Sequence, residues 1–159
     1  MQATTPTPTV PTAVPTTIYA GFMPRLGASI VDSIIVSIVS GIITFVLGMV
    51  IGIATGGSDA AVSVAQGLAS IIQFAIFAAY YIYFIGSKGQ TLGKMLLKIK
   101  VVNSETNAVP GYASAFLREV VGKILSSLVL GLGYLWMLWD PKKQTWHDKI
   151  AKTIVIKTS

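Results

Sequence analysis

The sequence predicts an all-α fold: a polytopic integral membrane protein built as a helical bundle. Hydrophobic residues make up 53% of the 159 residues, and charged residues make up only 11%. A soluble domain carries about a quarter charged residues, so much of this surface must face lipid. Two apolar stretches are long enough to cross a bilayer, and a shorter one follows them. We therefore expect two full spans plus a short re-entrant or third membrane helix segment.

The first 18 residues differ in composition from the rest of the chain. Residues 1–18 are rich in Thr and Pro and carry no charge. Such a segment buries too little apolar surface to form a core, so we expect a disordered tail. Residues 19–159 are then expected to form the membrane domain.

Two long apolar segments predict an antiparallel pair of membrane helices. The first covers about residues 26–53 and contains one charge, Asp32, while the second covers about residues 60–87 and contains none. Each would be about 42 Å long as a helix, which exceeds the roughly 30 Å hydrocarbon core. The short Gly-Gly-Ser sequence between them predicts a tight connection, and hence a helical hairpin.

A broken membrane hairpin is predicted at about residues 113–139. Its apolar part is only about 24 Å long as a helix, and Gly131 and Gly133 interrupt it. Lys and Arg concentrate in the linker 88–118 and in the basic C-terminal tail 140–159, which predicts that both are cytoplasmic. A re-entrant segment would keep both on one side, whereas a simple third span would separate them. We expect a multi-pass protein of the cell membrane with cytoplasmic termini.

Two short segments predict strands outside the membrane. Residues 98–102 and 152–157 contain β-branched residues in loose alternation with Lys, and residues 103–107 read as a turn. Pairing of the two segments would require both to lie on the same membrane face.

Composition also limits the partners and the chemistry. The net charge is +6 and Cys is absent, so anionic lipid headgroups are the expected counterpart and nucleic acid is not. We expect no cofactor, no metal site and no enzymatic activity. The segment 89–94 resembles a phosphate loop, but its glycines are too close together and Met95 follows Lys94, so nucleotide binding is not expected.

Three motifs resemble the RDD family of membrane proteins. They are Tyr19-Ala20-Gly21-Phe22 with Arg25 and Asp32, then Gly89-Gln90-Thr91-Leu92-Gly93-Lys94, and finally Gln144-Thr145-Trp146-His147-Asp148. The resemblance covers residues 19–157, with Lys152 standing where a small residue is more usual. The one Arg and two Asp that name the family carry over to Arg25, Asp32 and Asp148. The family implies a membrane protein for which transport has been suggested, with some members linked to sodium–proton antiport.

Asp32 is the strongest candidate site residue, because a carboxylate inside an apolar helix is costly and usually faces an interior or a water-filled path. Arg25 shares its helix face but lies about 10 Å away along the axis. We therefore expect Asp148 to pair with Arg25, and Lys123 to pair with Asp32. The set Arg25, Asp32 and Asp148 is either an ion or proton site or a structural ion-pair network.

Other polar residues are candidates for a lining around Asp32. They are Ser29, Ser33, Ser37, Gln66, Gln73, Lys123 and His147. His147 would titrate near neutral pH in a polar tail. Tyr80, Tyr81 and Tyr83 near the end of the second span are interpreted as interfacial anchors.

Two functional hypotheses follow. One is transport of ions or small solutes with Asp32 as the cation or proton site. The other is a non-transporting accessory or assembly protein whose charges are structural. Few helices are available to enclose a path, so transport would favour a homo-oligomer. Another membrane protein is the other partner expected, besides the lipid bilayer.

Overall fold

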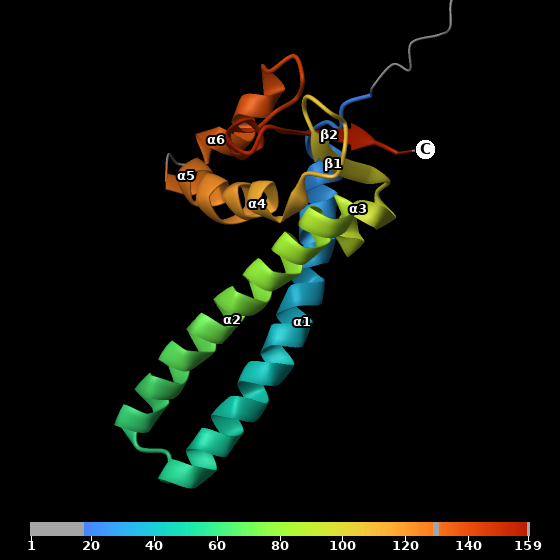
Figure 1. The fold of residues 1–159 in the computed structure, drawn as a ribbon. Helices are drawn as coiled ribbons and strands as arrows, with labels where there is room; N and C mark the ends of the chain where they lie inside the picture. The colour runs from blue at the N-terminus through green and yellow to red at the C-terminus, as the bar shows by residue number, and fades with distance from the viewer. Residues whose placement is uncertain (1–17, 129–130, 159) are drawn as a thin grey trace, which may run out of the picture.

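The computed structural model describes residues 18–128 and 131–158. The chain forms a long helical hairpin with a smaller folded head at one end (Figure 1). The predicted tail lies outside the described residues, except for Ile18.

The two predicted spans are the longest helices, α1 (Phe22–Thr55) and α2 (Asp59–Lys88). Gly56 ends α1 with a left-handed φ of 65°, a conformation that favours glycine. Ser58 is the N-cap of α2, and its hydroxyl accepts a hydrogen bond from the Ala61 N–H. The helical hairpin is therefore confirmed, and α1 begins early enough to place Arg25 in its first turn.

Most of the hairpin surface is apolar and exposed. Phe45 is 72% exposed, Ile53 78% and Phe74 56%. Both helices are long and apolar enough to cross a membrane. An apolar surface of this extent is stable only against lipid or partner helices.

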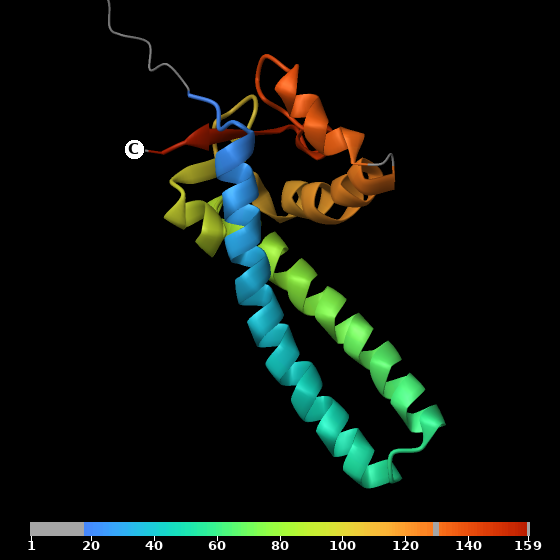
Figure 2. The same ribbon diagram turned by 180° about the vertical axis from the view of Figure 1, so that it is seen from behind.

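The head packs on the hairpin ends opposite the turn at Gly56 (Figures 1 and 2). Helix α3 (Leu92–Leu96) contacts α1, and α4 (Gly111–Phe116) contacts α2. A Cβ on Gly86 of α2 would lie 2.6 Å from Tyr112 Cδ1, so α4 approaches α2 at a distance that only glycine permits.

A two-stranded antiparallel sheet completes the head. Strand β1 (Ile99–Asn103) pairs with β2 (Thr153–Lys157), with Val101 opposite Val155. The predicted pairing of these segments is confirmed. The all-α class is accordingly too narrow: the protein is mostly helical with a small sheet, because these two β-branched runs pair with each other instead of continuing helices.

The third apolar region is broken, as predicted. Helix α4 continues into the π-helix η1 (Leu117–Gly122) and then α5 (Lys123–Leu128). After a break the chain continues as α6 (Leu132–Leu135) and the 3₁₀ turn η2 (Trp136–Leu138). The two arms are bent by 109°, the geometry of a broken span or a re-entrant loop.

Candidate functional site

Two fully buried carboxylates organise the head, Asp32 on α1 and Asp148 on α7 (Trp146–Ile150). An ionised carboxylate without partners is very costly in such a place. Each must therefore be compensated, and the two are compensated by different chemistry.

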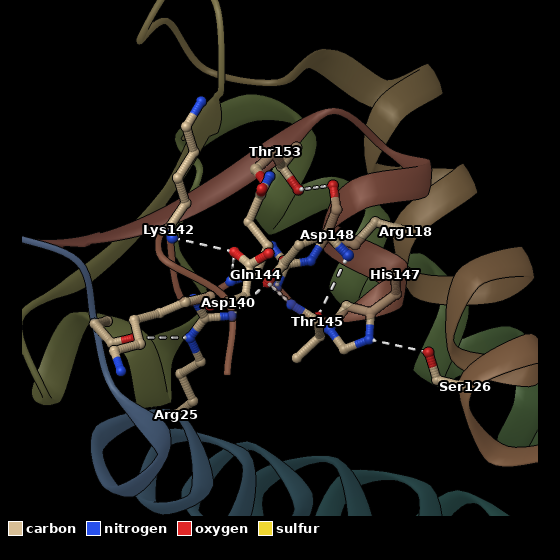
Figure 3. Close-up of polar contacts among 12 residues, drawn as sticks. Arg25, Arg118, Ser126, Asp140, Lys142, Gln144, Thr145, His147, Asp148 and Thr153 are labelled. Atoms are coloured by element: carbon tan, nitrogen blue, oxygen red, sulfur yellow. Dashed lines mark hydrogen bonds and ion pairs between the residues drawn. The ribbon is translucent and has the colours of Figure 1, made fainter. Parts of the chain in front are cut away.

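Asp148 lies between two arginines (Figure 3). Its Oδ2 is 2.5 Å from Arg25 Nη1, and its Oδ1 is 2.9 Å from Arg118 Nη2. Asp148 also completes a capping box with Thr145, which accepts from the Asp148 N–H while Asp148 accepts from the Thr145 N–H. The predicted pairing of Arg25 with Asp148 is confirmed.

Arg25 uses its whole guanidinium to join three segments. Besides Asp148, it donates from Nε to the Ala20 carbonyl at 3.1 Å and from Nη2 to the Lys143 carbonyl at 2.6 Å. The first turn of α1 is thereby tied both to the chain before it and to the C-terminal segment.

Arg118 was not predicted to be part of this site. It lies on η1 and is 3% exposed, next to Glu119, which is 2% exposed. Two adjacent opposite charges in a largely apolar stretch are the sequence signal for its burial, but the charge pattern alone indicates only one more basic residue of the linker 88–118.

The arginines fix the ionisation of the Asp148 carboxyl. Burial alone would raise its pKa, but Arg118 and Arg25 together hold the pKa well below the usual range. Asp148 is therefore a permanent anion at physiological pH.

His147 is buried rather than placed in a polar tail. It is 5% exposed, and burial lowers its pKa to about 3. Its Nδ1 lies 3.5 Å from the Ser126 hydroxyl (Figure 3). The expectation that His147 titrates near neutral pH is wrong, because an apolar environment penalises the charged imidazolium.

Asp32 is held by three neutral donors. Its Oδ1 accepts from the Tyr80 hydroxyl at 2.9 Å and from the Gly93 N–H at 2.7 Å, and its Oδ2 accepts from the Thr91 hydroxyl at 2.5 Å. Thr91 is also the N-cap of α3. Asp32 therefore fixes α3 against α1. Tyr80, interpreted from the sequence as an interfacial anchor, also donates a hydrogen bond to this carboxylate.

The predicted pairing of Lys123 with Asp32 is wrong. The Lys123 ammonium lies 2.5 Å from Glu119 Oε2 and 4.1 Å from the centre of the Tyr81 ring. Glu119 is four residues earlier in the chain, a separation that places side chains together on one helical face. Glu119, and not Asp32, is therefore the carboxylate that pairs with Lys123.

The predicted polar lining does not form around Asp32. The buried face of α1 carries Ala28, Asp32, Val36 and Ser40. The serines at 29, 33 and 37 are one residue further on, about 100° around the helix, and all three are exposed. Gln66 and Gln73 on α2 are exposed as well.

No metal centre is evident in the described ranges 18–128 and 131–158, where no three His, Asp or Glu side chains gather to hold an ion. The carboxylates there instead bond to groups of the chain itself. The arrangement can lock elements together, and it leaves Asp32 without an unshared oxygen.

Fold and site together define a helical membrane protein whose head is clamped to its first helix by buried carboxylates. The model of the RDD family matches residues 19–152. The chain belongs to the RDD family.

Several curated proteins are similar to part of the chain. An uncharacterized protein of Rickettsia prowazekii is 35% identical over 52% of this chain and 45% of its own length. A proline-rich antigen homolog of Mycobacterium tuberculosis is 32% identical over 58% of this chain and 38% of its own. The uncharacterized membrane protein YteJ of Bacillus subtilis is 31% identical over 55% of this chain and 52% of its own length.

The matched region spans about half or less of the length of these relatives. No solved structure matches the chain significantly.

Proposed function

We propose that this RDD protein is a non-transporting accessory or assembly protein of the cell membrane, in which Arg25, Asp32 and Asp148 are structural. The observation that carries the proposal is the environment of Asp32. Both carboxylate oxygens accept hydrogen bonds from Tyr80, Thr91 and Gly93, and the residue is 0% exposed. A cation would have to compete with these three donors for the two oxygens, and an exchanging proton would need a path to a closed site.

The hairpin supplies the surface for assembly. Few of the residues in its two apolar segments are buried within the chain. Lipid alone could cover this surface, but helices in membranes associate through small residues. Ser33, Ser37 and Gly41 follow one exposed stripe of α1. A second copy of the chain or another membrane protein would pack there.

The charge distribution supports a cytoplasmic head. All 12 Lys and Arg residues lie in the head or at the hairpin ends that enter it, and the turn between the spans has none. By the positive-inside rule, the head and both termini would then face the cytoplasm. In this topology the bent region made of η1, α5 and α6 re-enters the membrane from the cytoplasmic side.

A flux assay tests the proposal. Full-length protein in proteoliposomes should show no Na⁺, K⁺ or proton flux above protein-free vesicles, at acidic, neutral or alkaline pH. Asp32→Asn should lower the thermal unfolding midpoint in detergent, because a donor amide replaces one acceptor oxygen. Asp59→Asn, an exposed carboxylate at the far turn, is the matched control and should leave the midpoint unchanged. Cation flux by the wild type that Asp32→Asn abolishes at normal abundance would overturn the proposal.

A further inference from the structure

A cavity of about 360 Å³ opens beside the Asp148 cluster, between the first turns of α1, the end of α2, and the bent region. Its size falls within the range of about 300–1,000 Å³ that is usual for ligand sites. Neither Asp32 nor Asp148 lines it, although the two arginines that pair with Asp148 do. The proposed function does not use this cavity, so what it binds is a separate question.

The cavity is lined by four basic side chains and one acidic one. The basic residues are Arg25, Lys94, Arg118 and Lys123, and the acidic residue is Glu119. Asp148 behind the wall adds a second negative charge, which Arg25 and Arg118 share. Positive charge is therefore in excess around the cavity.

Most of these charges already have partners. The three nitrogens of the Arg25 guanidinium already donate hydrogen bonds to Ala20, Asp148 and Lys143. Lys123 is paired with Glu119 at 2.5 Å. Such groups shape the local potential but have little capacity left to bind a ligand directly.

Lys94 is different, because this largely buried residue has no ion-pair partner among the described residues. The residue is 9% exposed. Among the described residues its Nζ makes no ion pair or hydrogen bond, and its nearest aromatic contact is the Tyr81 ring at 5.6 Å. Burial lowers its pKa to about 8, which leaves it mostly protonated at neutral pH.

Arg118 offers a second free group in the same wall. Its Nη1 is buried and has no hydrogen-bond partner in the described part of the chain. Buried polar groups are normally satisfied. The unsatisfied Arg118 nitrogen and the unpaired Lys94 ammonium at one cavity thus point to an anion as the missing partner.

The remaining walls indicate what this anion is attached to. Phe22, Leu26 and Leu135 are apolar, and Tyr134 adds a hydroxyl-bearing ring. A phosphate group has several acceptor oxygens for Lys and Arg donors, and an apolar wall suits a glycerol or acyl portion. A bare inorganic ion would leave that wall unused.

We propose that this cavity binds the phosphate group of a phosphate ester, with Lys94 as the principal ligand and Arg118 as the second. An anionic phospholipid headgroup and a soluble phosphate ester share this chemistry. Asp32 helps to position Lys94. The Thr91 hydroxyl donates to Asp32 and also accepts from the Lys94 N–H at the start of α3.

Thermal unfolding of the full-length protein in a neutral detergent tests this proposal. Phosphatidylglycerol should raise the unfolding midpoint saturably and more than phosphatidylcholine does. Glycerol phosphate is the soluble arm: protection by it equal to that by phosphatidylglycerol would assign the site to soluble esters, and protection by the lipid alone would assign it to the headgroup. Failure of both to protect the wild type would overturn the proposal.

Variants locate the site. Lys94→Gln should lose at least about tenfold in affinity for the protecting ligand, the effect of losing a charge-assisted hydrogen bond. Without ligand its midpoint should equal or exceed that of the wild type, because a buried unpaired charge is removed. Lys142→Gln, an exposed lysine outside the cavity, is the matched control and should bind normally. Equal affinities of the two variants would overturn the assignment to this cavity.

Discussion

The negative charges of the two buried carboxylates, Asp32 and Asp148, are compensated in opposite ways. Asp148 is neutralised by two arginines from distant segments, whereas Asp32 accepts hydrogen bonds only from uncharged donors. Loss of charge on one partner of an ion pair leaves the other partner uncompensated. Loss of the charge on Asp32 leaves no unpaired charge, because its neutral cage, the donors Tyr80, Thr91 and Gly93, is uncharged. The same residue type in one head therefore carries different energetic consequences.

The largest expected effect comes from removing the charge of Asp148. Asp148→Asn leaves Arg25 without its carboxylate partner and Arg118 with only Glu119, whose Oε1 lies 3.4 Å from Arg118 Nε, at a cost of about 3–5 kcal/mol. Asp32→Asn keeps one acceptor oxygen and creates no unpaired charge, so about 1–3 kcal/mol is expected. Membrane abundance and the thermal midpoint in detergent measure both variants. Equal losses would show that the two carboxylates are equivalent after all.

A smaller effect should follow from crowding the neutral cage. A Cβ on Gly93 would meet the Ala28 carbonyl and lie 2.9 Å from Asp32 Oδ1, so Gly93→Ala should destabilise the head by about 1–3 kcal/mol. Gly67→Ala is the matched control, since its Cβ would meet nothing within 4 Å. Thermal unfolding should separate the two variants. A midpoint for Gly93→Ala equal to that of Gly67→Ala would mean that α3 is not held tightly against α1.

The smallest effect at neutral pH belongs to His147. Its pKa of about 3 in the folded protein lies below the ordinary 6.5, so the unfolded chain binds the extra proton first. Stability should fall as the pH drops from about 6.5 towards 4. The pKa of Asp148 is also depressed in the folded protein, from an ordinary value of 3.8. The stability that this carboxylate contributes is therefore lost only as the pH falls below about 4.

Unfolding midpoints between pH 7 and 4 measure this slope. His147→Gln should remove most of it. An unchanged slope in that variant would place the responsible proton elsewhere.

The sequence by itself determined the longest elements, the two strands and two long-range contacts, the pairing of β1 with β2 and that of Arg25 with Asp148. Apolar length and the Gly-Gly-Ser turn predicted α1 and α2, alternation predicted β1 and β2, and the resemblance placed Arg25 and Asp148 in one charged set. These features depend on local pattern, or on charges that must find a counterion within a largely apolar chain.

Only the tertiary structure decided which groups surround each carboxylate. Asp32 and Gly93 are 61 residues apart, and no periodicity links them. A rotation of one residue around α1 excludes Ser33 and Ser37 from the buried face and places Asp32 on it. Burial of His147 and Arg118 likewise depends on how η1 and α7 pack against each other. Partners, faces and burial come from packing between distant segments, which a single sequence does not encode as a local signal.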